Sequence, residues 1–254
     1  MERVILGVRF TFLAPQQIVA NALKGGLLVA PSGPGLAVDF VCSDEYRQAL
    51  QTADFVLPDS GWMCLLWRVF NRETLPRISG LAFVNTLVNG GYLRDRDDLF
   101  WILPSPRDAD ATRKWAHTHR VCVEPENTYI APIYSREPID DPALVGELKR
   151  ARPSIIILAI GGGVQERVGL AIRRSLDYRP TILCIGAALA FVTGQQVHIP
   201  SWADRLYLGW LFRIASSPTT YLPRYISAVK LARSMWKYRS QPPPLASNHD
   251  KWPS

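Results

Sequence analysis

Residues 155–160 read Ile-Ile-Ile-Leu-Ala-Ile and contain no polar side chain. A strand with one face in water would alternate apolar and polar residues, so this strand is expected to be covered on both faces. Strands covered in this way are typical of parallel sheets whose crossover helices pack on either side. This run therefore predicts an α/β fold, and the apolar segments 99–103 and 181–185 extend the same pattern.

Segments of helical period separate these strands along most of the chain. Ser43, followed by Asp44 and Glu45, is typical of an N-cap with an acidic first turn and predicts a helix to about Thr52. The expected strands lie at 26–30, 54–57, 99–103, 120–123, 154–160 and 181–185, and the expected helices at 43–52, 61–70, 81–88, 107–119, 142–150 and 165–176. We therefore expect residues 1–199 to form a Rossmann-like three-layer α/β sandwich with a mostly parallel sheet.

The sequence changes character after Pro200. Between Arg205 and Arg239 there are seven basic residues and no Asp or Glu, and Trp and Tyr are frequent. Without these seven, the other 22 Lys and Arg equal the 22 Asp and Glu, so the formal net charge of +7 is concentrated on this segment. We expect residues 200–240 to be a helical appendage, and residues 241–254, which begin Gln-Pro-Pro-Pro, to be a disordered tail.

Three kinds of surface fit this basic, aromatic appendage. It could bind nucleic acid, lie on a membrane, or form a solvated face that closes over the sheet. Trp and Tyr beside Lys and Arg, without acids, favour an anionic bilayer surface contacted through residues 205–239. The neutral body and the lack of a recognisable nucleic-acid module argue against a nucleic-acid partner.

Several classes of protein are excluded by missing patterns. The chain contains neither G-x-G-x-x-G nor G-x-x-x-x-G-K-[ST], which argues against NAD binding and against a P-loop ATPase. Its four cysteines are far apart and include no C-x-x-C pair, so they read as buried thiols in a reducing compartment. The longest apolar run, 181–193, is shorter than the roughly 20 residues of a membrane-spanning helix. No secretory signal or transmembrane helix is expected.

Polar and glycine-rich turns follow four of the expected strands. In an open parallel sheet, ligands bind at the carboxyl ends of the strands, so these turns are the first candidates for a site. They are the turn with Ser32, the turn with Asp59, the turn Gly161–Gly162–Gly163 followed by Gln165 and Glu166, and the turn with Gly186. Glycines there let a backbone approach a phosphate, and a helix opening at Val164 would direct its N–H groups at an anion.

Each of these features also has a plainer interpretation. The spacing of the glycines by itself favours tight strand-to-helix turns over a phosphate site. Asp59 could be a general base toward a hydroxyl or the N-cap of the helix that begins near Gly61. Gln165 and Glu166 could bind a sugar or base hydroxyl, or could be ordinary first-turn residues favoured by the helix dipole.

Metal and hydrolase chemistry have little support in the sequence. His117 and His119 are two residues apart and would point to different sides of a helix. Asp95, Asp97 and Asp98 lie among arginines and are typical of a solvated charge run. Asp59-Ser60-Gly61 is not a G-x-S-x-G nucleophile turn. We expect no metal ion and no cofactor.

Seven short motifs follow one another along the chain. They are Leu57–Gly61 (LPDSG), Arg77–Leu81 (RISGL), Gly161–Glu166 (GGGVQE), Ile185–Gly194 (IGAALAFVTG), Ile199–Trp202 (IPSW), Leu208–Arg213 (LGWLFR) and Pro223–Tyr225 (PRY). Their order resembles that of the WecG/TagA/CpsF family of bacterial glycosyltransferases, and the resemblance runs from about residue 26 to residue 226. The specificity lies in the shared order and spacing of seven short motifs rather than in any one of them.

This resemblance implies roles for individual residues. It implies Asp59 as the catalytic base, and Gln165 and Glu166 as residues of the nucleotide-sugar pocket. The other implied substrate-binding residues are Ser32, Arg77, Gly80, Gly161, Gly162, Gly163, Gly186, Arg213 and Arg224, the last two as diphosphate or lipid contacts. Transfer with inversion needs a base on the acceptor hydroxyl, and arginines can neutralise a UDP leaving group without a metal.

The chain departs from the family pattern at three places. Ala30-Pro31-Ser32 stands where the family usually has Thr-x-Asn, Ala190-Phe191 lacks the Asp expected there, and Gly209 replaces a Glu. These losses bear on the identity of the sugar and leave room for an inactive relative.

The resulting hypothesis is a glycosyltransferase that moves an N-acetylmannosamine-like sugar or a related hexose from a UDP-sugar to a polyprenyl-diphosphate-linked saccharide. It would act in exopolysaccharide or cell-wall polymer synthesis, as an inverting, metal-independent enzyme held peripherally at the cytoplasmic face of a bacterial membrane. The alternative is a catalytically silent protein that binds a nucleotide sugar or a partner at the membrane. A homo-oligomer is left open.

Overall fold

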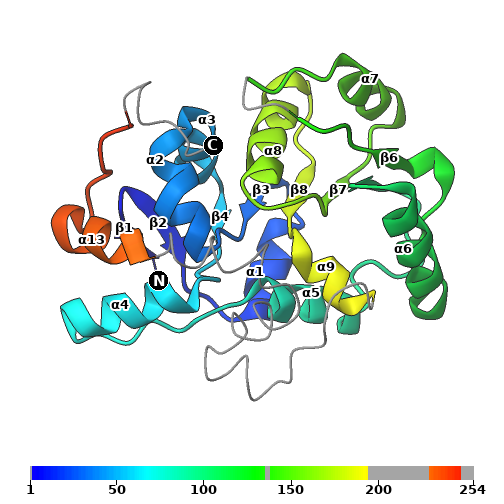
Figure 1. Ribbon diagram of the computed structural model, residues 1–254. Helices are drawn as coiled ribbons and strands as arrows, with labels where there is room; N and C mark the ends of the chain where they lie inside the picture. The colour runs from blue at the N-terminus through cyan, green and yellow to red at the C-terminus, as the bar shows by residue number, and fades with distance from the viewer. Residues whose placement is uncertain (1, 135–137, 194–228, 247–254) are drawn as a thin grey trace.

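The computed structural model describes residues 2–134, 138–193 and 229–246. Its centre is a parallel sheet in the order β4-β3-β8-β7-β5-β6 (Figure 1). The strands are β3 (Gly26–Val29), β4 (Phe55–Val56), β5 (Leu99–Leu103), β6 (Thr128–Ile130), β7 (Ile155–Leu158) and β8 (Thr181–Cys184). A separate antiparallel hairpin is formed by β1 (Glu2–Ile5) and β2 (Val8–Thr11).

Helices cover both faces of this sheet. They are α1 (Pro15–Ala22), the π-helix η1 (Gly35–Asp39), α2 (Phe40–Cys42), α3 (Asp44–Thr52), α4 (Gly61–Asn71), α5 (Gly80–Asn89), α6 (Pro106–His119), the 3₁₀-helix η2 (Pro125–Asn127), α7 (Pro142–Ala151), α8 (Val164–Ser175), α9 (Ala187–Val192) and α13 (Val229–Tyr238). Every residue of β3, β5, β7 and β8 is buried, as the apolar runs predict.

The strands divide their side chains between two hydrophobic cores. Ile156 and Leu158 point into a core shared with α3, α7 and α8, whereas Ile155 and Ile157 point into a core shared with α1, α5, α6 and α9. Alternate residues of one strand therefore pack on opposite layers of helices, as the pleat of a strand requires. The expected Rossmann-like three-layer sandwich is confirmed.

One expected strand is wrong. The sequence predicts a strand at 120–123, but Arg120 ends α6 in the left-handed conformation and Val121 makes a single bridge to Arg94. The edge of the sheet is instead occupied by β6, whose residues are half-buried or exposed. An edge strand of this kind lacks the continuous apolar run that reveals the central strands.

The C-terminal part of the chain returns to the hairpin. Residues 200–228 of the expected appendage lie outside the described residues, and α13 is the part that is described. After α13, the N–H groups of Leu6 and Gly7 donate to the carbonyls of Arg239 and Ser240. Ala246 N–H donates to the carbonyl of Val41. Residues 241–246 of the expected disordered tail therefore have defined contacts, and the residues from 247 on lie outside the described part.

A membrane-spanning helix needs roughly 20 predominantly apolar residues. None of the helices in the described part of the chain combines that length with that apolarity.

Candidate active site at the carboxyl edge of the sheet

Four neighbouring strands carry the predicted site residues on the turns that follow them. In sheet order these are β4 with Asp59, β3 with Ser32, β8 with Gly186 and β7 with Gly161–Gly163. Because all six strands are parallel, their carboxyl ends lie along one edge. The structure thus brings turns that are far apart in sequence to one edge of the sheet, where open α/β proteins bind their ligands.

Asp59 is held by the segment that opens the next helix. Its Oδ1 accepts a hydrogen bond from Gly80 N–H at 3.0 Å, and Arg77 Nη2 lies 3.7 Å from the same oxygen. Arg77 Nε also donates to the Asp59 carbonyl at 2.7 Å. Among the described residues, Asp59 Oδ2 has no hydrogen-bond partner. The sequence motifs around Asp59 and Arg77-x-x-Gly80 therefore form one structural unit.

The plainer interpretation of Asp59 as an N-cap is wrong. The N-cap of α4 is Ser60, whose side chain accepts from Met63 N–H at 3.2 Å. The Asp59 carboxylate instead meets the N-terminus of α5, whose own cap is Ser79. Asp59 thus satisfies one of the backbone N–H groups that the first turn of a helix leaves without a partner.

Gly80 lies between the turns that follow β3 and β8. A Cβ on Gly80 would meet the Cβ atoms of Ala188 at 3.6 Å and of Ala30 at 3.8 Å. The turn after β3 in addition packs on the start of α4, because a Cβ on Gly33 would lie 3.0 Å from Ser60 Oγ. Three strand-end turns therefore contact one another around Asp59.

Ser32, which is expected to bind substrate, makes a hydrogen bond within its own turn. Its Oγ accepts from Gly35 N–H at 3.2 Å, where the chain enters η1. Gly35 is required there because a Cβ would lie 2.5 Å from Tyr46 Oη. Single π-helical turns inside longer helices are frequently found at functional sites, and this one directly follows the turn after β3.

The glycine turn after β7 is open on one side and tightly packed on the other. Gly161 and Gly162 are exposed, and a Cβ on either would meet no atom within 4 Å. Gly163 has a φ of 90°, and a Cβ there would lie 2.9 Å from Asp39 Oδ2. The first two glycines leave the backbone accessible, and the third is required by its backbone conformation and by the nearby carboxylate.

Gln165 and Glu166 are not solvated first-turn residues. Both side chains are buried, at 3% and 1% exposure. Glu166 Oε2 accepts from Gly163 N–H at 2.7 Å, and Gln165 Nε2 donates to Glu166 Oε1 at 3.2 Å. Burial raises the pKa of Glu166 to about 7 against the opposing effect of these hydrogen bonds, and the charge of Asp39 adds to the rise.

A buried acceptor without a partner lies at the end of this network. Gln165 Oε1 is buried and, within the described residues, accepts no hydrogen bond. A Cβ on Gly186, which has a φ of 48°, would lie 3.1 Å from this atom, so Gly186 is what lets the amide approach the turn after β8. Such an acceptor costs about 1–3 kcal/mol when unsatisfied, and groups of this kind call for a functional explanation.

Asp39 is the residue of this region that the sequence analysis missed. It ends η1, its carboxylate lies against Gly163, and its charge acts on Glu166. No sequence signal marks it, because the contact joins residues that are far apart in the chain.

Two of the predicted substrate-binding residues, Arg213 and Arg224, lie outside the described residues, so the structure does not place them. In the described part of the chain, no group of three or more His, Cys, Asp and Glu side chains could hold a metal ion. Asp98 pairs with Arg96, whose hydrogen bond lowers the pKa of the Asp98 carboxyl, and Asp95 pairs with Arg120, as a solvated charge run predicts.

Comparison with known proteins gives consistent matches. The model of the glycosyl transferase WecG/TagA/CpsF family matches residues 3–244. An N-acetylglucosaminyldiphosphoundecaprenol N-acetyl-beta-D-mannosaminyltransferase from Bacillus subtilis (strain 168) is 24% identical over 215 residues, which are 84% of this chain and 80% of the relative. The protein of the same name from Bacillus spizizenii (strain ATCC 23059 / NRRL B-14472 / W23) is 21% identical over 212 residues, 80% of this chain and 79% of the relative.

The family match covers nearly the whole chain and includes every motif on which the resemblance was based. The parallel sheet and the convergence of the Asp59, Arg77 and Gly80 segments agree with it. The protein therefore belongs to the WecG/TagA/CpsF family and is a glycosyltransferase.

Proposed function

We propose that this glycosyltransferase moves an N-acetylmannosamine-like sugar from a UDP-sugar to a saccharide linked to a polyprenyl diphosphate. The Bacillus relatives are named for transfer of N-acetyl-beta-D-mannosamine to N-acetylglucosaminyldiphosphoundecaprenol, which supports this class of acceptor. The observation that carries the proposal is Asp59, at the carboxyl edge, with Oδ1 bound by Gly80 N–H and beside Arg77, and with Oδ2 unpartnered among the described residues.

Asp59 is proposed as the general base of a single displacement. Its Oδ2 takes the proton of the acceptor hydroxyl while that oxygen forms a bond to the anomeric carbon of the donor sugar. The bond from the anomeric carbon to the UDP oxygen breaks, and its electron pair leaves with UDP. Attack from the side opposite UDP inverts the anomeric centre. Gly80 N–H and Arg77 keep the carboxylate oriented during this step.

The glycine turn and the amide of Gln165 are proposed to bind the donor. Gly161 and Gly162 are exposed at the start of α8, where backbone N–H groups and the helix dipole favour a phosphate. Gln165 Oε1 would accept from a donor hydroxyl or N–H group, which would satisfy it. Ser32 and Gly186 border the same edge. We propose that arginines, Arg213 and Arg224 among them, neutralise the leaving group without a metal ion.

A lipid-linked acceptor also suggests where the enzyme works. We propose a peripheral position at the cytoplasmic face of the membrane, with the anionic surface contacted through residues 205–239. The seven basic residues of that segment and the absence of acids from it support this position.

The test is the variant Asp59→Asn, compared with Asp110→Asn. Asp110 is an exposed carboxylate on α6 and serves as the matched control. We expect Asp59→Asn to lower turnover of a UDP-sugar with a lipid-diphosphate acceptor by about 10²–10⁴-fold, because a positioned base contributes about that much. UDP affinity, measured by calorimetry with and without divalent metal, should stay within about twofold of the unaltered protein.

Two outcomes would contradict the proposal. Equal turnover in the two variants would remove Asp59 from the chemistry. UDP-sugar binding without turnover in the unaltered protein, under any acceptor supplied, would favour the catalytically silent alternative.

A further inference from the structure

Helix α4 exposes apolar side chains along one side. Leu65 and Val69, four residues apart on the same side of the helix, are 43% and 64% exposed. Trp62 lies on that side one turn earlier and is 39% exposed. The buried residues of the helix are Met63, Cys64 and Leu66. We refer to Leu65 and Val69 as the α4 stripe.

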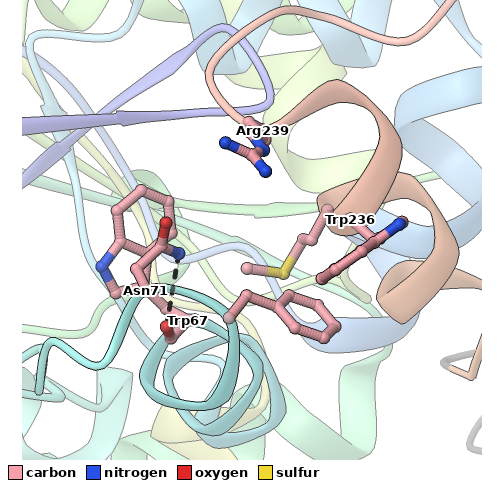
Figure 2. Close-up of a pocket in the computed structure, with 6 residues that line it drawn as sticks. Trp67, Asn71, Trp236 and Arg239 are labelled. Atoms are coloured by element: carbon pink, nitrogen blue, oxygen red, sulfur yellow. Dashed lines mark hydrogen bonds between the residues drawn. The ribbon is translucent and has the colours of Figure 1, made fainter.

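The neighbouring helix α13 does not cover this stripe. It packs against the other side of the C-terminal end of α4, where Trp236 and Arg239 face Trp67 and Asn71 (Figure 2). The rings of Phe70 and Trp236 meet edge to face at 5.4 Å. At 100° per residue, the positions that contact α13 and the positions of the α4 stripe lie on opposite sides of the helix.

Exposed arginines flank the stripe. Arg68 and Arg72 lie beside it, residues 61–72 contain no Asp or Glu, and the carboxylate of Glu73, the next residue, is paired with Arg3. Exposed cations of α13, Lys230, Arg233 and Lys237, lie on the adjoining helix, which lacks acids. An apolar stripe flanked by an excess of arginines and lysines is the composition of a segment that lies in the interface of an anionic membrane.

We propose that the α4 stripe docks on an anionic lipid surface, with Leu65 and Val69 in the acyl boundary and Arg68 and Arg72 at the lipid phosphates. This surface is formed by α4 of the catalytic domain and adjoins α13, the described part of the basic segment 205–239. The proposal rests on the proposed function for its purpose, because a lipid-linked acceptor lies in the same membrane.

A second copy of the chain fits this surface less well. An isologous dimer through α4 would bring Arg68 and Arg72 of one copy toward the same residues of the other, together with the cations of both α13 helices. Like charges that meet in an interface oppose association. Lipid phosphates supply the opposite charge.

The stripe is directly connected to the proposed base. Asp59 and Ser60 immediately precede α4, and Leu65 lies about 6 Å along the helix axis from Gly61. Docking through α4 therefore fixes the distance between the Asp59 carboxylate and the lipid surface from which a polyprenyl diphosphate would project.

The test is binding of the full-length protein to sedimented vesicles. The variant Leu65→Gln/Val69→Gln is compared with Ile133→Gln, which alters a fully exposed apolar residue after β6, the edge strand opposite β4. On vesicles of mixed phosphatidylglycerol and phosphatidylcholine, we expect the α4 variant to bind about tenfold more weakly and the control to bind like the unaltered protein. Arg68→Gln should weaken binding by about fivefold, and Lys149→Gln on α7 should not.

Each alternative occupant of the stripe predicts a different result. Unchanged vesicle binding by the α4 variant overturns the proposal. If that unchanged binding is accompanied by a smaller oligomer in sedimentation velocity, the stripe contacts a second copy. If it is accompanied by a lower unfolding temperature, the stripe packs within the chain.

The result is also separable from the proposed function. With a water-soluble short-chain acceptor, the α4 variant should turn over like the unaltered enzyme, whereas Asp59→Asn should not. Vesicle binding can be scored even if no transfer is observed.

Discussion

Asp59 lies beside the N-termini of two helices, α4 and α5, and only α5 binds its carboxylate. Ser60 caps α4, which leaves the Asp59 carboxylate available, and the N-terminus of α5 supplies Gly80 N–H to one of its oxygens. The sequence could indicate Asp59 because it follows an apolar strand. It could not indicate the bond to Gly80, because that contact depends on how α5 packs at the end of the sheet.

Glu166 lies in the first turn of α8, yet its side chain is buried. Polar residues in first turns are usually solvated, so its burial could not be predicted from the sequence. The cost of burying its charge appears as a raised pKa of about 7.

This pKa predicts how stability depends on pH. The folded protein keeps the Glu166 proton up to about pH 7, whereas an unfolded Glu loses it near its ordinary pKa of 4.5. Folding therefore takes up a proton in this window, and the contribution of Glu166 to the free energy of unfolding decreases as pH rises from about 4.5 to about 7. In Glu166→Gln, the free energy of unfolding should lack this contribution and decrease less between about pH 5 and pH 8. Urea denaturation at a series of pH values measures it.

The control for this measurement is Glu126→Gln. Glu126 is exposed, so its variant should keep the pH dependence of the unaltered protein. If Glu166→Gln also keeps it, ionisation of Glu166 is not what changes stability in this range.

At the scale of elements, the sequence predicted those with the strongest periodicity. The helix capped by Ser43 and the strand Leu99–Leu103 are observed at the expected residues. The hairpin β1–β2 was missed because each strand has four residues and mixed polarity. The edge strand β6 was missed because its three residues carry no buried run, and its position is set by pairing with β5.

The cap of α4 gives a prediction at this scale. Ser60→Ala should lower the free energy of unfolding by about 1 kcal/mol, because Met63 N–H loses its acceptor. It should also reduce turnover, since Ser60 fixes the start of the helix next to Asp59. Ser43→Ala, which removes the equivalent cap of α3, should cost similar stability and leave turnover unchanged. Denaturant unfolding and the transferase assay measure both effects, and equal loss of turnover in the two variants would contradict the assigned role.

At the scale of the whole molecule, charge is distributed unevenly. The formal net charge of +7 is carried by residues 205–239, and the described part of that segment adjoins α4 through α13. The strand–helix alternation revealed the layered body, but not that α13 packs on α4. That contact joins residues that are far apart in the chain, and sequence periodicity carries no information about it.

This distribution predicts a salt dependence. Vesicle binding should weaken several-fold as ionic strength rises from about 0.05 to about 0.5 M, because the attraction between cations and lipid phosphates is screened. The measurement is vesicle sedimentation across a salt series, with phosphatidylcholine vesicles as the uncharged reference. Binding to anionic vesicles that stays constant across the series would mean that apolar insertion alone holds the protein.

The pairing of β3 with β8 has a consequence for synthesis of the chain. Gly26 pairs with Thr181 and Val29 pairs with Cys184, so the centre of the sheet joins an early strand to a late one. Such a contact closes a long loop, and its entropic cost must be met before the pairing can stabilise anything. A nascent chain on the ribosome therefore cannot assemble the edge that carries Ser32 and Gly186 until β8 has emerged. Any fragment that ends earlier will lack transferase activity, however well its first helices form.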